Sequence, residues 1–284
     1  MINIFCFGYG QVAEKFIDQL SKDKKVNVSY TSRSIENKNN THRVFRLDEN
    51  FFDPKIIEYL HNSDFILISI PPINGNDIVI KHFSKELKKL KTKWITYLSA
   101  TSVYGNHNGE WVNEKSLTEP TSETGINRLA AENNWISLHK QANLPIQVFR
   151  LSGIYSNSNN IIKRLKIGSA KIIKKKNHFF SRIHVEDIAN VLIKSMTNFK
   201  SGEVYNISDD RPASTEEITT YAANLIKVDV PKKTDHEKLE NGMLKDFYKD
   251  SKKVNNSKMK KFFNYDLKFP SFIEGLRYIK DKSF

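Results

Sequence analysis

The sequence predicts an α/β fold, a doubly wound parallel sheet with a small C-terminal lobe. Three observations lead to this prediction: a glycine-rich turn directly after an apolar N-terminal run, apolar runs that alternate with helical patterns, and the lack of an internal repeat. Strands that alternate with crossover helices form right-handed parallel sheets, and ligands of such sheets bind at the carboxyl ends of the strands. Candidate functional residues are therefore sought where each strand ends.

The first predicted strand covers residues 2–7, which are mostly β-branched or aromatic. It ends in Gly-x-Gly-x-x-Ala, and an amphipathic helical pattern follows. Gly8 lets the chain turn sharply, and Gly10 lacks a Cβ, so a pyrophosphate could approach the backbone at the helix N-terminus. This motif is typical of a Rossmann sheet, although a tight turn without a ligand is the alternative. We expect the turn to bind a dinucleotide cofactor through Gly8, Tyr9, Gly10, Gln11 and Val12.

The second predicted strand, residues 25–30, indicates which dinucleotide binds. An acidic residue after this strand would bind the ribose 2′-hydroxyl of NAD, but the chain has Thr-Ser-Arg-Ser at residues 31–34. Arg33 could bind a 2′-phosphate through charge-assisted hydrogen bonds, with the hydroxyl of Ser32 or Ser34 assisting. The sequence therefore favours NADP over NAD as the cofactor, and a solvated Arg33 is the alternative.

Strand and helix patterns alternate along the chain after the second predicted strand. Apolar runs predict strands at residues 64–70, 94–99 and 146–150, and helical patterns predict helices at 78–90 and 129–138. Two prolines, beginning at Pro71, stop the first of these strands abruptly. In a doubly wound sheet the ends of the three strands would place further cofactor contacts beside the glycine turn. The candidates are Ile70, Pro71, Ser99 and Ser152.

We expect two parts in the chain. Residues 1–155 are expected to form the NAD(P)-binding Rossmann domain, with residues 181–210 returning to it. Residues 156–180 and 211–284 are expected to form a smaller substrate-binding lobe. A length of 284 residues permits one large domain or two modest ones.

The composition indicates a soluble globular chain, because 39% of its residues are hydrophobic and no run is long enough to span a membrane. Cys6 is the only cysteine, so an internal disulfide and a thiolate metal cluster are excluded and no metal site is predicted. The N-terminus lacks the pattern of a signal peptide, and the expected location is cytoplasmic.

The net charge of +13 raises the question of a polyanionic partner. Basic clusters occur at residues 163–176 and 245–261, but they are mostly lysine without interleaved aromatic residues for stacking on bases. A solvated face is the expected role, and nucleic-acid binding is the weaker alternative. A second possibility is that one cluster lines the entrance for a phosphorylated substrate.

Five ordered segments carry a family resemblance. They read YLSATSVYG at 97–105, NE and PTS within 113–122, FRLSGIY at 149–155, SRIHVEDIA at 181–189 and GEVYNIS at 202–208. Together they resemble the short-chain dehydrogenase/reductase superfamily in its extended and atypical branch, which is NAD(P)-dependent and epimerase/dehydratase-like. The resemblance covers essentially the whole chain. It implies a small-molecule substrate, phosphorylated or nucleotide-linked in many relatives, and a homodimer in many of them.

The chain departs from the resemblance at the catalytic positions. Relatives carry a Ser or Thr, then a Tyr followed four residues later by Lys, where this chain has Ala100, Thr124 and Arg128. In relatives the Lys lowers the pKa of the Tyr phenol, so that it can exchange a proton with the substrate during hydride transfer. A Thr hydroxyl titrates too high for this, and Arg128 could hold the nicotinamide ribose but cannot act as an acid or base. The remaining catalytic candidates are Thr101, Tyr104, Thr124 and Arg128.

Two functions are therefore open on the sequence. The first is an NADP-dependent reductase-like or epimerase/dehydratase-like enzyme that acts on a small polar or nucleotide-linked substrate in the C-terminal lobe. The second is a non-catalytic NADP-binding sensor or scaffold that has lost the catalytic Tyr and Lys. No residue pattern in the lobe selects a particular substrate.

Overall fold

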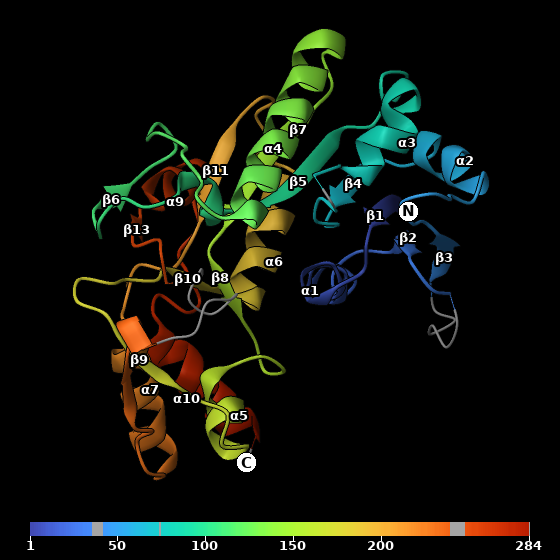
Figure 1. Cartoon of the computed structure of the whole chain (residues 1–284). Coiled ribbons are helices and arrows are strands. Elements are labelled where there is room, and N and C mark those ends of the chain that lie inside the picture. Colours follow the sequence, from blue (N-terminus) through green and yellow to red (C-terminus); the bar gives the residue numbers. More distant parts are fainter. Residues whose placement is uncertain (36–41, 74, 239–247, 284) are drawn as a thin grey trace. The chain divides into compact units, whose positions relative to one another are not determined.

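A computed structural model describes residues 1–35, 42–73, 75–238 and 248–283 (Figure 1). The chain divides into two compact units. Unit 1 comprises Met1–Ala100, Asn127–Arg150 and Ile188–Tyr205, and unit 2 comprises Thr101–Ile126, Leu151–Asp187 and Asn206–Phe284. Residues 101–126, 151–155, 181–187 and 206–210, which were expected in the Rossmann domain, lie in unit 2.

A seven-stranded sheet has the order β11-β7-β5-β4-β1-β2-β3. Its strands are β1 (Ile2–Phe7), β2 (Val26–Ser32), β3 (Arg43–Arg46), β4 (Phe65–Ile68), β5 (Trp94–Ala100), β7 (Ile146–Leu151) and β11 (Val204–Ile207). The pairs from β3 to β5 are all parallel, with Phe7 opposite Ile68 and Ile68 opposite Tyr97. The order reverses between β1 and β4, as in a doubly wound sheet. The predicted fold class is confirmed.

Helices cover both faces of this sheet: α1 (Gln11–Leu20), α2 (Lys55–His61), α3 (Ile78–Leu87), α4 (Glu123–Ala142) and α6 (Val185–Ser195). On one face, α2, α3 and α4 share a core with β1, in which Phe83 packs on Phe7 with ring centroids 5.5 Å apart. On the other face, Phe16 of α1 stacks on Trp94 of β5, and the Trp94 indole donates to Ser195 Oγ at 3.0 Å. The strand ends between these layers are thus held in fixed positions.

Unit 2 contains three parallel strand pairs and its own apolar core. The pairs are β6 (Trp111–Val112) with β13 (Lys253–Val254), β8 (Gly153–Tyr155) with β10 (Arg182–His184), and β9 (Ile172–Lys174) with β12 (Lys233–Asp235). The helices are α5 (Ile161–Lys166), α7 (Thr215–Ile226), α9 (Ser257–Phe263) and α10 (Phe272–Ser283), with 3-10 turns η1 (Thr101–Tyr104) and η2 (His236–Lys238). Because β6 pairs with β13 and β10 pairs with β8, the segments that contain β6 and β10 belong to this unit.

Asp187 holds the C-terminal segment within unit 2. Its carboxylate accepts hydrogen bonds from the Tyr265 hydroxyl at 2.6 Å and from the backbone N–H groups of Lys268 and Phe269 at 2.7 and 3.1 Å. Burial raises the pKa of Asp187, and these three donors oppose that shift. The Ile-His-Val-x-Asp segment is therefore structural at this position.

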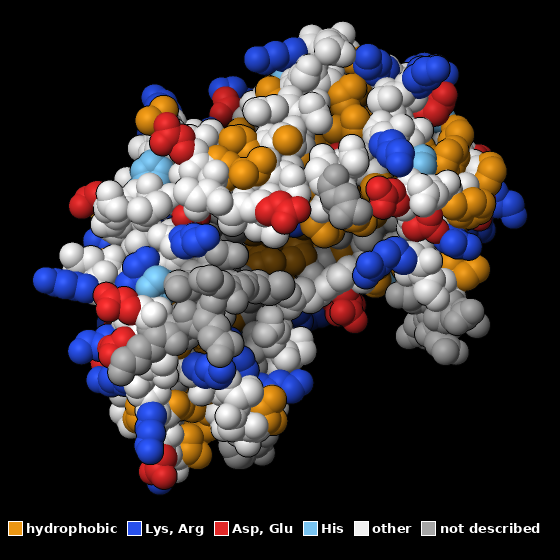
Figure 2. All heavy atoms as spheres, in the orientation of Figure 1, with side chains coloured by type: hydrophobic (Ala, Val, Ile, Leu, Met, Phe, Trp, Pro, Cys, Tyr) orange, Lys and Arg blue, Asp and Glu red, His pale blue; other side chains and the backbone are white. Residues whose placement is uncertain are grey.

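The surface shows basic and acidic side chains interspersed over the visible face (Figure 2). Lys166, Lys171, Lys174 and Lys176 of the first basic cluster are exposed. Residues 245–247 of the second cluster lie outside the described residues. Across the described ranges, no helix is long and apolar enough to cross a membrane, and no group of three or more His, Cys, Asp or Glu could hold a metal ion.

Candidate functional site

The glycine turn of unit 1 is braced by the two strands that flank β1. Gly8 has φ +84°, a left-handed conformation that strains residues with a side chain. Its N–H donates to Thr31 Oγ1 at 3.0 Å, and its carbonyl accepts from Ser69 Oγ at 3.2 Å. A Cβ at Gly8 would lie 3.0 Å from Ile70 Cγ1 and from Ser69 Oγ. Close packing as well as backbone conformation therefore requires glycine here.

The second glycine has open space around it. Gly10 is exposed and extended, with φ −87° and ψ −175°, and no side chain caps the helix that follows. A Cβ at Gly10 would meet no heavy atom within 4 Å. The first N–H groups of α1 carry the positive end of the helix dipole, and an anion can bind them where the backbone is approachable. These residues fit a dinucleotide pyrophosphate.

The neighbouring side chains fix the turn against the sheet. The Tyr9 ring stacks on Tyr30 with centroids 4.4 Å apart, and the His42 ring meets Tyr9 edge-on at 5.8 Å. Val12 is buried and Gln11 is half-buried in the first turn of α1. Stacking on Tyr30 and burial of Val12 therefore anchor the turn within unit 1.

The other predicted cofactor contacts of unit 1 lie at the same edge of the sheet. Ser32 ends β2 and is half-buried, and the next residue, Arg33, is exposed. Ile70 and Pro71 follow β4. Ser99 lies at the end of β5, buried, and its Oγ has no hydrogen-bond partner among the described residues. Because β5, β4, β1 and β2 are adjacent and parallel, their carboxyl ends bring these residues to the edge that holds the glycine turn.

Arg128 reaches this edge from α4. Its Nη1 donates to the Leu98 carbonyl of β5 at 2.7 Å. Burial raises the pKa of the neighbouring Tyr97 phenol, and the Arg128 charge opposes that shift. A guanidinium has five N–H donors, so Arg128 retains donors for a ligand after this contact.

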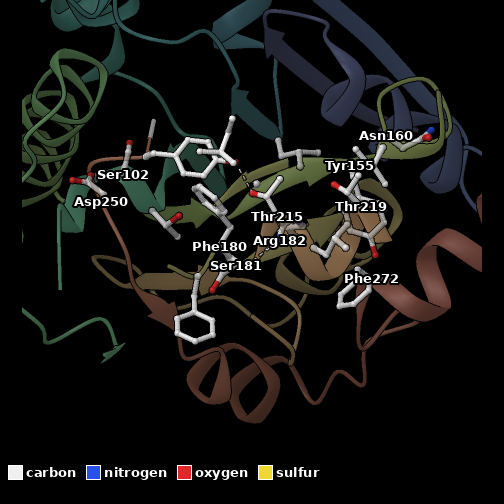
Figure 3. A pocket seen from close by; sticks show the side chains of 18 of the residues that line it. Ser102, Tyr155, Asn160, Phe180, Ser181, Arg182, Thr215, Thr219, Asp250 and Phe272 are labelled. Carbon is white, nitrogen blue, oxygen red and sulfur yellow. Dashed lines mark hydrogen bonds between the residues drawn. The ribbon is translucent and has the colours of Figure 1, made fainter. Parts of the chain in front are cut away.

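Unit 2 encloses a cavity of about 770 Å³ (Figure 3). Two of the predicted catalytic residues, Thr101 and Thr124, line it together with Ser102 and Ser122. Thr101 and Ser102 come from η1, and Thr124 comes from the first turn of α4. The structure thus brings four hydroxyl groups to one cavity.

Two predicted site residues of unit 2 do not line this cavity. Tyr104 is fully buried, and its hydroxyl donates to Asn206 Oδ1 at 2.7 Å. Ser152 is buried too, and its N–H donates to the Ile207 carbonyl at 3.0 Å. Tyr104 therefore has a structural contact in unit 2.

Sequence reasoning missed several cavity residues. Arg182 of β10 lines the cavity, and its Nη1 donates to the carbonyls of Phe180 and Ala213 at 2.9 and 3.1 Å. Burial lowers the pKa of Arg182 to about 10. Tyr248 also lines the cavity, and its hydroxyl donates to Thr215 Oγ1 at 2.7 Å. The segment around Arg182 was recognised from the sequence, but nothing in it indicated a cavity, and Tyr248 lies in a stretch without a recognisable motif.

A buried histidine supports one wall of the cavity. The His178 ring stacks on Tyr248 with centroids 4.9 Å apart and meets Phe180 edge-on at 4.5 Å. Its Nε2 has no hydrogen-bond partner among the described residues. Burial, and then the charge of Lys175, lower the pKa of His178 from 6.5 to about 4.

This shift predicts an acid-sensitive stability. Between pH 6.5 and about 4, His178 is protonated in the unfolded chain but neutral in the folded one. The free energy of unfolding should therefore fall as the pH drops through this window, by up to about 1.4 kcal/mol per pH unit. Urea unfolding at a series of pH values measures this slope. His178→Phe, which keeps the ring contacts, should show a smaller slope, and equal slopes in the two proteins would contradict the assignment.

Comparisons with known proteins agree with this architecture. The model of the NAD dependent epimerase/dehydratase family matches residues 80–208. A functionally unknown conserved protein from Silicibacter pomeroyi is 32% identical, with 99% of each chain covered and a TM-score of 0.91. The search of curated proteins gave no match.

Two more distant structures share the fold. A dTDP-glucose 4,6-dehydratase from Bacillus anthracis, solved in complex with NAD, is 16% identical, covers 99% of this chain and 96% of its own, and has a TM-score of 0.77. A UDP-glucuronic acid 4-epimerase from Bacillus cereus, solved with UDP-glucuronic acid and NAD, is 19% identical, covers 99% and 100%, and has a TM-score of 0.80.

Proposed function

Because the chain belongs to the NAD-dependent epimerase/dehydratase family, we propose that it is an NADP-binding reductase-like or epimerase/dehydratase-like protein that acts on a small polar or nucleotide-linked substrate. The observation that carries the proposal is the turn from Gly8 to Gly10. Gly8 is held by hydrogen bonds and close packing, Gly10 leaves open space beside the backbone, and no side chain caps the N-terminus of α1 that follows. Unit 1 binds the cofactor, and the cavity of unit 2 binds the substrate.

The preference for NADP rests on the end of β2. Arg33 is exposed directly after Ser32, and none of the described residues 31–35 after this strand is acidic and able to bind a ribose 2′-hydroxyl. The two distant relatives were solved with NAD, so a preference for NADP would distinguish this chain from them.

Arg33→Gln should therefore separate the two cofactors. We expect NADPH to bind about 10- to 100-fold more weakly, because charge-assisted hydrogen bonds to the 2′-phosphate are lost. NADH affinity should stay unchanged. Calorimetric titration of both dinucleotides measures this, and an equal effect on both, or none on NADPH, would count against NADP selectivity.

Different residues of the chain have different roles in the proposed reaction. When bound, the nicotinamide ring supplies hydride donation and acceptance. Arg128, anchored on the Leu98 carbonyl, holds the nicotinamide ribose through its remaining donors. Thr101 and Thr124 donate hydrogen bonds to a substrate oxygen within the cavity of unit 2. A Thr hydroxyl is too weak an acid to donate a proton near neutral pH, so water would supply or take up the proton at the substrate oxygen.

Stopped-flow absorbance of bound NADPH tests this function directly. The protein is loaded with NADPH or NADP⁺ and mixed with carbonyl compounds and with sugar nucleotides. A substrate-dependent change of the nicotinamide absorbance is expected. Stable NADPH absorbance with every compound would contradict a reductase-like or epimerase-like activity.

A second candidate function is a non-catalytic NADP-binding sensor or scaffold. It is favoured by Ala100, Thr124 and Arg128 at the positions where relatives carry their catalytic set, and by the Tyr104 hydroxyl being bonded to Asn206. It predicts tight NADPH binding without turnover in the same stopped-flow experiment. A homodimer and a cytoplasmic location stay predictions of the sequence.

A further inference from the structure

The cavity of unit 2 has two chemically different ends (Figure 3). Ser102 and Asp250 lie at one end, and Tyr155, Thr219 and Phe272 lie at the other. Arg182 lies between them. The position of a charged group between a polar and an apolar region limits what can fill the cavity.

The far end is part of the apolar core of unit 2. Five residues of that core also line the cavity: Tyr155, Ile161, Ile218, Phe272 and Leu276. A wall of this kind gains most when it covers an apolar part of a ligand, because such burial contributes about 0.8 kcal/mol per methylene. A ligand that is polar throughout would offer this apolar wall no apolar surface to contact.

The cavity wall carries an excess of positive charge. Arg164, Lys171 and Arg182 line the cavity, and none of them forms an ion pair with a carboxylate in the part of the chain that the structure describes. Burial is the larger cause that lowers the pKa of Arg182, and the positive charge of Arg164 helps to lower it. Arg164 and Lys171 are exposed to solvent, whereas burial disfavours the charged form of Arg182, so an anion in the cavity would stabilise the Arg182 charge.

The acidic groups nearby do not cancel this charge. Asp250 lines the cavity, but it accepts from Thr121 Oγ1 at 2.7 Å and lies 3.6 Å from Lys252 Nζ, so it is already compensated. Asp209 favours the charged form of Arg182, and burial raises the pKa of Asp209 well above its ordinary value, but Asp209 does not line the cavity. Of the lining carboxylates, Glu123 remains, on the exposed first turn of α4.

A buried hydroxyl at the apolar end gives an independent indication of a ligand. Thr219 of α7 is fully buried, lines the cavity, and has an Oγ1 without a hydrogen-bond partner among the described residues. Leaving a buried hydroxyl unsatisfied costs stability. Because this Oγ1 is fully buried in the structure, a polar atom of a ligand would bond it after a small shift of the cavity wall.

We propose that this cavity binds an organic anion with an apolar body, whose carboxylate or phosphate lies between Arg164 and Arg182 and whose far end carries a hydrogen-bonding group beside Thr219. The inference rests on the proposed function only in taking the cavity as the substrate site, and it assigns an amphiphilic anion in place of a small polar or nucleotide-linked substrate.

Calorimetric titration of the full chain with n-octyl phosphate and octanoate tests the proposal. At least one of the two should bind, and the better of them identifies the anionic group. Inorganic phosphate and octanol should bind at least about 10-fold more weakly, because phosphate lacks the apolar chain and octanol lacks the negative charge. From butyl to octyl, affinity should rise by up to about 4-fold for each methylene. Absence of binding, or tighter binding of UDP-glucose than of either octyl compound, would overturn the proposal.

Matched variants locate the anion. Arg164→Gln removes a charge from the cavity wall, whereas Lys163→Gln removes one from the same helix outside it. The first should weaken binding of the octyl anion about 10-fold or more, and the second should change it little. Equal effects of the two variants would show general electrostatic attraction and overturn the site.

Thr219→Val tests the far end without changing the shape of the side chain. The wild type should bind ω-hydroxyoctanoate more tightly than octanoate, and the variant should lose this difference. If the variant keeps the difference, the Thr219 contact is wrong. All titrations are done with and without NADPH, so a chain that binds the octyl anion but no dinucleotide would contradict the proposed function and leave the cavity assignment standing.

Discussion

Replacing Gly10 with valine is expected to weaken NADPH binding by about 100-fold or more, because the side chain would occupy the open space beside the backbone and keep the pyrophosphate from the N–H groups of α1. Gly10 is exposed, and its φ of −87° suits any residue. The free energy of unfolding should therefore change by no more than about 1 kcal/mol, the scale of an altered helix cap. Calorimetric titration and urea unfolding measure the two effects separately.

Gly8→Ala serves as the contrasting variant. Its Cβ would press on Ile70 and Ser69, and its φ of +84° is strained for alanine, so this change should destabilise the fold by about 1–3 kcal/mol. Unchanged NADPH affinity in Gly10→Val would show that the dinucleotide does not use this turn.

Truncating Glu132 to alanine is expected to cost about 3–5 kcal/mol of unfolding free energy, because it leaves the Arg150 charge buried without its carboxylate. Arg150 Nη2 donates to Glu132 Oε2 at 2.8 Å, and Arg150 Nε donates to both carboxylate oxygens at 3.1 and 3.2 Å. The two side chains are only 8% and 3% exposed. Urea unfolding of the variant measures the loss.

The double variant Glu132→Leu/Arg150→Met is the control for this prediction. It removes both charges and fills similar volume, so most of the lost stability should return. A loss below about 1 kcal/mol in the single variant would show that water reaches Arg150 and screens its charge.

The elements with strong sequence patterns were predicted correctly, and the weakly patterned ones were not. The β1–α1 turn and strands β4, β5 and β7 follow continuous apolar runs, which leave little choice of structure. The helix predicted at residues 129–138 is longer in the structure, as α4 covers Glu123–Ala142, because its first turn is polar and carries no apolar period. β3 and α2 are short, and no run of apolar residues marks them.

The cavity of unit 2 could not be predicted, for a physical reason. Its wall takes one to four neighbouring residues from each of many separate segments, so no single motif describes it. Arg164 and Lys171 belonged to a cluster for which a phosphorylated substrate was one possibility, and the structure places both on the cavity wall. Arg182 and Thr219 become candidate binding residues only through their burial and their hydrogen-bond partners, which cannot be read from the sequence.

The central claim, that unit 1 binds NADP through the Gly8–Gly10 turn and Arg33, is tested most directly by calorimetric titration of the wild-type chain with NADPH and NADH. We predict saturable binding of NADPH and binding of NADH that is weaker by about 10-fold or more, the contribution of a charge-assisted contact with the 2′-phosphate. Absence of heat and of saturation with both dinucleotides would contradict the claim.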